Sequence, residues 1–134
     1  MAENPLKVLS SIAKFYREAL RRDKAGRDLA RLLGLHNDQV LERFKVGFAN
    51  GSLLRAIPSK GEVRDILAGA GLLTPDGQEA FSGYLMVPAT DQNQNVLGFV
   101  AIGQAGKETA LPAGIPLYRL NWEAFQQKEW FFRK

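Results

Sequence analysis

Residues 81–103, FSGYLMVPATDQNQNVLGFVAIG, constrain the fold of this 134-residue chain more than any other stretch. Two apolar runs, 84–87 and 96–102, flank the polar segment 91–95, whose Asp and Asn residues favour a chain reversal. The pattern predicts a β-hairpin with strands over 84–89 and 96–102. Because the polar segment contains no glycine, we expect a loop longer than a two-residue turn.

The chain before the hairpin has the pattern of short helices. Apolar residues three and four positions apart predict an amphipathic helix over 5–22. A second helix over 25–33 should end at Gly34, since glycine readily adopts the left-handed conformation found just past helix ends. A third helix should be capped by Asn37 or Asp38 and should end at Gly47.

Further elements follow from cap and turn chemistry. A short helix is expected over 52–57, and residues 59–62 have capping-box form, with Ser59 and Glu62 satisfying the first amides of a helix that ends at Gly71. Residues 74–77 predict a turn and residues 105–116 a loop, and residues 122–134 are compatible with a terminal helix. We therefore expect one α+β domain over residues 1–134, with several short helices packed on a small antiparallel or mixed sheet that contains the hairpin.

The composition excludes several classes of chemistry. There is no cysteine, hence no disulfide, thiolate nucleophile or cysteine-based zinc site, and the single histidine, His36, follows a helix stop in a connection. No GxSxG elbow, phosphate-binding glycine loop or metal-spaced carboxylate cluster is present, so we expect no self-contained catalysis and no cofactor. A hydrolase or transferase would have only His36 to build on. No run approaches the roughly 20 apolar residues that span a bilayer, and no signal peptide is evident, so we expect a cytoplasmic protein without membrane contact.

The charge is unevenly distributed along the chain. Residues 1–64 carry 13 basic and seven acidic side chains, whereas residues 65–134 carry five basic and seven acidic ones. A basic half beside a nearly neutral half suggests a polyanionic partner, with nucleic acid the first candidate. The alternative is a solvated helical surface whose charges pair locally, as the spacings Lys14–Glu18, Glu18–Arg22 and Asp23–Arg27 suggest.

Five short segments between residues 10 and 104 share the order and spacing of a known pattern. They are Phe15-Tyr16; Gly34-Leu35; Val40, Phe44, Gly47, Phe48 and Ala49; Ala70-Gly71-Leu72-Leu73; and Phe81, Met86, Pro88, Asp91, Val96, Gly98 and Phe99. In these residues the chain resembles the N-terminal subdomain of the catalytic core of bacterial DnaG-type primases. The resemblance implies that the hairpin belongs to a small subdomain abutting a Toprim domain, where basic residues hold single-stranded DNA template and RNA primer.

The sequence departs from the family pattern where the family carries charge. Its hairpin arginine positions are occupied here by Ala80, Ser82, Tyr84 and Ile102, and the turn glycine by Gln94. The zinc-ribbon module and the acidic Toprim metal site are also missing, so Mg²⁺ or Mn²⁺ would be needed only by a Toprim domain located elsewhere. Lys107 and residues 117–119 are loose counterparts of the segment that follows the hairpin in the family.

Two functions follow from the match and its departures. The first is a non-catalytic, nucleic-acid-handling subdomain that holds single-stranded DNA or RNA primer and docks a Toprim-type domain or replication protein. Its candidate contact residues are Arg17, Arg21, Arg27, Arg31, Lys45, Lys60, Tyr84 and Lys107. The second is a degenerate primase-like scaffold that acts as a protein-interaction module without binding nucleic acid, because the hairpin arginines are gone. The aromatic residues Phe81, Tyr84 and Phe99 on the sheet are either base-stacking groups or, as we prefer, core residues with only Tyr84 partly exposed.

Overall fold

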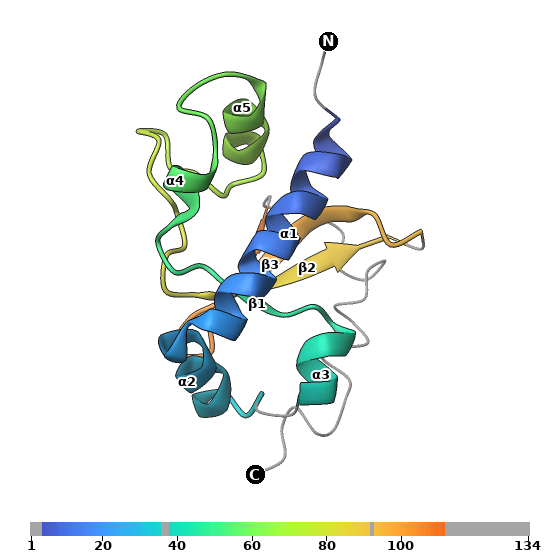
Figure 1. Cartoon of the computed structure of the whole chain (residues 1–134), viewed down its shortest axis with the longest axis vertical. Helices are drawn as coiled ribbons and strands as arrows, with labels where there is room; N and C mark the ends of the chain where they lie inside the picture. The colour runs from blue at the N-terminus through green and yellow to red at the C-terminus, as the bar shows by residue number, and fades with distance from the viewer. Residues whose placement is uncertain (1–3, 36–37, 92, 112–134) are drawn as a thin grey trace.

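The computed structural model describes residues 4–35, 38–91 and 93–111, and these form an α+β fold (Figure 1). The helices in these ranges are α1 (Pro5–Arg22), α2 (Lys24–Leu32), α3 (Asp38–Arg43), α4 (Leu53–Ala56) and α5 (Glu62–Gly69). The strands are β1 (Gly47–Phe48), β2 (Leu85–Thr90), β3 (Val96–Ile102) and β4 (Glu108–Leu111). The expected fold class and the expected helices before the hairpin are therefore confirmed, with boundaries shifted by a few residues.

The strands form one antiparallel sheet in the order β1-β2-β3-β4. The predicted hairpin is its centre: Leu85 lies opposite Ile102 and Ala89 opposite Gly98, and the register shifts between Ala89 and Thr90. The predicted loop over 105–116 is wrong at β4, which pairs with β3. Four residues with a polar beginning carry too little periodicity to indicate a strand, and the neighbouring strand supplies the hydrogen bonds that form it.

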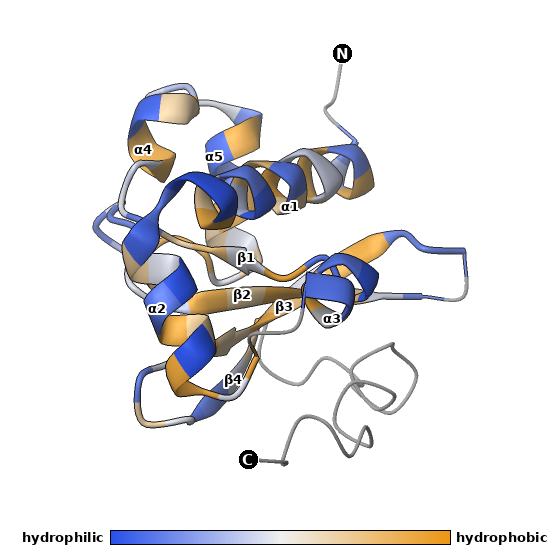
Figure 2. Ribbon diagram, turned by 60° about the horizontal axis from the view of Figure 1, so that its bottom comes forward, coloured by the Kyte–Doolittle hydropathy of each residue, from blue (hydrophilic) through white to orange (hydrophobic). Residues whose placement is uncertain are grey.

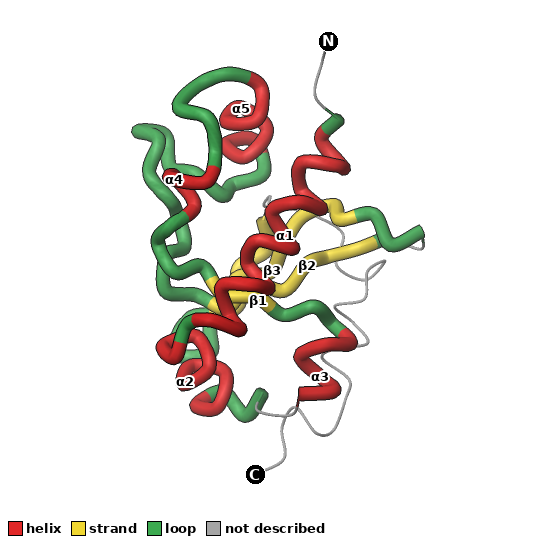
Figure 3. The backbone as a smooth tube through the Cα atoms, viewed as in Figure 1, coloured by secondary structure: helices red, strands yellow, loops and turns green. Residues whose placement is uncertain are grey.

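Both faces of the hairpin are buried, and the alternation of its side chains explains why the sequence shows continuous apolar runs. Met86, Phe99 and Ala101 pack with residues of α1, α4 and α5 on one face. Val87 and Val100 belong to a second cluster on the other face, together with residues of α2 and of the chain between α3 and β1. Figure 2 shows the hydrophobic strands between these helices, and Figure 3 shows the long loops that connect α4 and α5 to the sheet.

Helix α1 lies across β1, and Gly47 makes this close approach possible. A Cβ atom at Gly47 would lie 2.6 Å from the backbone carbon of Tyr16, a distance that real side chains do not tolerate. The prediction that Gly47 ends the third helix is therefore wrong. Helix α3 ends at Arg43, and Lys45 turns the chain with φ of 54°. Glycine is needed at position 47 because α1 packs closely against β1, and not because a helix ends there.

The capping-box prediction over 59–62 is also wrong. The N-cap of α5 is Gly61, with φ of 108° and no side-chain cap hydrogen bond, so Ser59 lies outside the helix. Other turn predictions are confirmed: Gly34 and Gly71 adopt positive φ after α2 and α5, and the Gly77 amide donates to the Thr74 carbonyl at 2.9 Å.

The hairpin loop is longer than two residues, as predicted, and Asp91 organises it. One Asp91 carboxylate oxygen accepts from the backbone amides of Asn93 and Asn95 at 2.8 and 2.9 Å, and the other accepts from the Asn95 side chain at 3.1 Å. The Asn95 side-chain hydrogen bond, followed by the Asn95 backbone bond, holds the pKa of Asp91 below its ordinary value. Gln94 has φ of 66°, the backbone conformation that glycine favours.

Some predictions fall outside the described residues. These are the roles of His36 and Asn37, the helix expected over 122–134 and the loose family counterpart at 117–119. Within the described ranges, no helix combines the length and apolar character required to cross a membrane.

Candidate nucleic-acid interface

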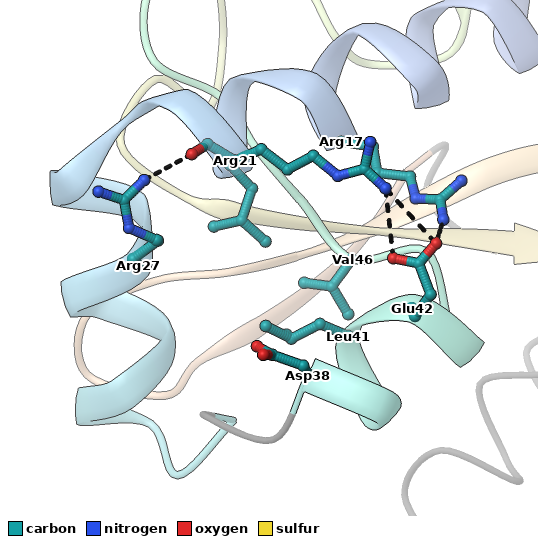
Figure 4. Close-up of a pocket in the computed structure, with 8 residues that line it drawn as sticks. Arg17, Arg21, Arg27, Asp38, Leu41, Glu42 and Val46 are labelled. Carbon is teal, nitrogen blue, oxygen red and sulfur yellow. Dashed lines mark hydrogen bonds and ion pairs between the residues drawn. The ribbon is translucent and has the colours of Figure 1, made fainter.

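Helix α1 presents Arg17 and Arg21 one turn apart, and both guanidinium groups contact Glu42 of α3 (Figure 4). Arg17 forms an ion pair with Glu42 Oε1, and Arg21 lies 3.3 Å from Glu42 Oε2. Arg21 also donates to Glu18 at 2.9 Å. Two of the predicted phosphate-contacting residues therefore already bind carboxylates in this structure.

A pocket of about 360 Å³ lies between α1, α2 and α3 at this point. Arg27 of α2 also lines it and donates to the Arg21 carbonyl at 2.6 Å, while Leu20, Leu41 and Val46 form its apolar wall (Figure 4). Asp38 adds a second lining carboxylate beside Glu42. The pocket therefore gathers three arginines, two of which share the carboxylate of Glu42.

The ion pairs at this pocket are open to exchange. The Glu42 side chain is 58% exposed and that of Arg21 is 55% exposed. Exposed pairs of this kind contribute about 0–1 kcal/mol, because water screens the charges and ordering long side chains costs entropy. This small contribution applies to the Arg21–Glu42 pair, since the Arg17 side chain is only 26% exposed.

The other predicted contact residues do not line this pocket. Arg31 lies 3.8 Å from Asp28, and Asp28 also accepts a hydrogen bond from Lys24 at 2.9 Å. The hydrogen bond from Lys24 is the main cause that lowers the pKa of Asp28. Lys45, Lys60 and Lys107 are exposed at three separate positions: before β1, before α5 and between β3 and β4.

Tyr84 is half-buried, and its ring packs within the fold. It meets Phe81 edge-on with ring centroids 5.2 Å apart, and a Cβ atom at Gly103 would lie 2.8 Å from Tyr84 Cε2. Phe99 is fully buried, as predicted, whereas Phe81 is only half-buried. Tyr84 is thus partly exposed, as preferred from the sequence, and its ring also packs on Phe81.

The former arginine positions show why the hairpin itself offers no cationic surface. Ile102 is 2% exposed and belongs to the core cluster that includes α2 residues, Ala80 is half-buried and Ser82 is exposed. Residues 80–103 contain no lysine or arginine. The hairpin forms without these charges, and most of the described lysines and arginines lie on α1 and α2.

A second feature that the sequence prediction missed is a buried carboxylate. Glu79 accepts from the first amide of α4, on Leu53, at 3.4 Å, while its Oε2 atom is buried without a hydrogen-bond partner among the described residues. Burial raises the pKa of Glu79, and the Leu53 amide partly opposes that shift. Burial, with a smaller effect from the Glu79 charge, also raises the pKa of Tyr16. Its bond to the α4 amide gives Glu79 a structural role at the start of that helix.

Metal-binding groups are not assembled in the described residues: no group of three or more His, Cys, Asp or Glu side chains is placed to hold an ion there. The ion pairs that form also differ from those expected from spacing. Glu18 pairs with Arg21 rather than with Lys14 or Arg22, and Asp23 caps α2 through the Ala25 amide at 3.0 Å. The missed partner, Glu42, comes from a separate helix, which no local spacing reveals.

Comparison with solved structures identifies the class of fold. No protein-family model matches the sequence, and no curated protein sequence matches it significantly. The structure is similar to the DnaG catalytic core, with a TM-score of 0.72 and 23% identity over 81% of this chain and 38% of that one. It is also similar to the DnaG primase catalytic domain bound to single-stranded DNA, with a TM-score of 0.69, 23% identity and the same coverage.

A third similar structure is the RNA polymerase domain of Mycobacterium tuberculosis primase DnaG in complex with double-stranded DNA. Its TM-score is 0.58, with 28% identity over 72% of this chain and 33% of that one. The fold is thus that of a primase catalytic core, and more particularly it resembles the part of the DnaG catalytic core that this chain covers. The chain spans well under half of the length of each of these structures.

Proposed function

We propose that this chain is a nucleic-acid-handling subdomain that holds single-stranded DNA or an RNA primer beside a polymerase centre on another domain. The observation that carries the proposal is the placement of charge. Most of the described cations lie on α1 and α2, while residues 80–103 contain none. The similarity to a primase catalytic domain bound to single-stranded DNA supports it.

The binding would be electrostatic and tolerant of sequence. Arginine and lysine side chains neutralise backbone phosphates and release counterions, so affinity falls as salt rises. In the pocket between α1 and α3, a phosphate would compete with Glu42 for Arg17 and Arg21. Binding through this pocket is therefore expected to be weak, because breaking the ion pairs with Glu42 offsets part of the binding free energy.

Titration of a fluorescent oligo-dT with the protein at low and moderate salt tests the proposal. We expect binding at micromolar protein in low salt, with log K falling by about 0.7 per phosphate contact for each tenfold rise in salt. An RNA oligomer of equal length should compete, because phosphate contacts do not distinguish the two backbones. No binding at micromolar protein even in low salt would exclude this function.

In this role the chain would supply no catalytic group and no metal ligand of its own. A Toprim-type domain or another replication protein would bring the Mg²⁺ or Mn²⁺ site, and the complex would work in the cytoplasm where replication proceeds. Mixing the chain with a separately purified Toprim domain of a DnaG primase, followed by size-exclusion chromatography, checks for docking. We expect co-elution, and separate elution at tens of micromolar would contradict this partner.

The substituted arginine positions favour one second candidate, a protein-interaction module that no longer binds nucleic acid. Ala80→Arg with Ser82→Arg tests it, since Tyr84 packs against Phe81 and is better retained. If nucleic-acid binding was lost at the hairpin, this variant should bind oligo-dT where the parent does not. Equal affinity of the two proteins would contradict this second function.

A further inference from the structure

A second pocket lies on the other flank of α1, beside the chain that leads into α4. Its volume is about 300 Å³, near the lower end of small-ligand pockets. Lys14, Phe15 and Arg22 line it from α1, and Asn50 and Ser52 line it from the chain before α4. Figure 1 shows α3 on one side of α1 and α4 on the other, so the two pockets use different neighbours of the same helix.

The cations of this second pocket are available, in contrast to those that contact Glu42. Lys14 and Arg22 are exposed, and neither forms an ion pair with a residue in the described part of the chain. Glu18 is the one acid among the described lining residues, and it lies 2.9 Å from Arg21. The pocket thus holds two cations, and the one carboxylate among its described lining residues is paired with Arg21, which does not line it.

Two further groups give the pocket the chemistry of a nucleotide site. Asn50 Oδ1 accepts from the Ser52 amide at 3.1 Å and from the Ser52 hydroxyl at 2.5 Å. With its oxygen used in this way, the Asn50 side chain offers its NH₂ group as a donor. Phe15 is half-buried and tilted against Tyr16, with ring centroids 6.1 Å apart, and contributes an apolar wall.

We propose that this pocket binds one nucleotide unit of a single strand. Lys14, Arg22 and the Asn50 amide contact the phosphate, and the adjoining base packs on Phe15. The inference rests on the proposed function, but it assigns the main contact to residues outside the set predicted from the sequence. The physical reason is that a phosphate need not displace a carboxylate to reach Lys14 or Arg22.

The test is anisotropy titration of oligo-dT with Lys14→Ala/Arg22→Ala and with a control that loses the same charge, Lys24→Ala/Arg43→Ala. We expect the pocket variant to bind at least tenfold more weakly and its salt slope to flatten by about 0.7, equivalent to one phosphate contact. The control should change affinity less than threefold. An equal loss in both variants would mean a general charge effect and would overturn the site.

Phe15→Leu separates base packing from phosphate contact. Base stacking on an aromatic ring corresponds to a fivefold or larger loss when the ring is removed. The loss should therefore appear with oligo-dT and disappear with an abasic oligomer of the same length. Phe15→Tyr should restore binding, and circular dichroism with thermal melting checks that each variant is folded. Equal losses on both oligomers would remove Phe15 from the site.

The outcomes distinguish this inference from the proposed function. If the parent binds oligo-dT and the Lys14→Ala/Arg22→Ala variant binds equally well, the pocket assignment fails and the proposed function stands. If the parent does not bind, both fail. Free dTMP at millimolar concentration should compete poorly, because a single nucleotide makes one set of contacts, and full competition would instead identify a mononucleotide site.

Discussion

The surface of α1 and the β2–β3 hairpin differ in how much charge they carry and in what surrounds it. The hairpin has an antiparallel backbone with a left-handed turn position at Gln94, but residues 80–103 carry no lysine or arginine. The α1 surface carries the charge, but its availability depends on which neighbour each residue meets: Arg17 and Arg21 face Glu42, whereas Lys14 and Arg22 do not. Geometry and charge can therefore be changed separately in this molecule, and substitutions can test that separation.

The largest expected effect is at Gly47, where α1 lies against β1, the strand that pairs with β2 of the hairpin. Gly47→Ala places a Cβ 2.6 Å from the Tyr16 backbone, so α1 must move away from β1. We expect the free energy of unfolding in urea to fall by about 1–3 kcal/mol, as for other overpacked sites. Gly69→Ala is the control, since nothing lies within 4 Å of its added Cβ. Equal stability of the two variants would contradict the close packing of α1 against Gly47 of β1.

The second prediction changes charge availability and leaves the fold alone. Glu42→Gln removes the carboxylate that Arg17 and Arg21 share, so oligo-dT affinity at low salt should rise about fivefold, equivalent to about 1 kcal/mol. Stability should change by less than about 1 kcal/mol, because the pair is exposed. Glu18→Gln removes the same charge but releases only Arg21, and should have a smaller effect. No gain for Glu42→Gln would mean that this flank of α1 does not meet the strand.

The third prediction is the converse, a change of hairpin geometry without a change in charge. Gln94→Gly relieves the positive φ at the turn, so chemical denaturation should show stabilisation by about 0.5–1 kcal/mol with unaltered oligo-dT affinity. Asn93→Gly is the matched control and should give no gain. A changed affinity in the Gln94 variant would place the hairpin loop at the interface and break the separation.

The smallest effect concerns acid stability of the same loop. The folded-state pKa of Asp91 is lowered, so its contribution to stability is present above the ordinary value of 3.8 and is lost as pH falls through the folded-state pKa. Asp91→Ala should therefore melt at a lower temperature than the parent at pH 7, and the difference should vanish in strong acid. A difference that persists there would mean that the Asp91 charge is not what stabilises the loop.

Local signals in the sequence were sufficient for much of the fold. The apolar spacing of 5–22 gave α1 to the residue, and the Asp and Asn residues at 91–95 gave the longer hairpin loop. Errors arose where a residue serves a distant contact. Gly47 has the sequence appearance of a helix end but serves the approach to Tyr16, and β4 depends on pairing with β3.

The candidate site was less predictable than the fold for the same reason. The basic character of α1 is visible in the sequence, and the seven-residue spacing of Lys7, Lys14 and Arg21 already places Lys14 on its charged surface. Whether an arginine is available depends on Glu42, which reaches α1 only through the tertiary fold. The basic residues of α1 could therefore be predicted from the sequence, but the ion pairs that some of them form with Glu42 could not.

The double-sided burial of the hairpin limits where this chain can vary. A polar or bulky replacement inside β2 or β3 would disturb one of two cores, whereas positions 80, 82 and 94 lie in the approach and the loop, outside the paired strands. Substitutions should therefore be tolerated best just before β2 and in the loop between β2 and β3. An engineer who wishes to install a new recognition surface on this scaffold would place it there and leave the strands untouched.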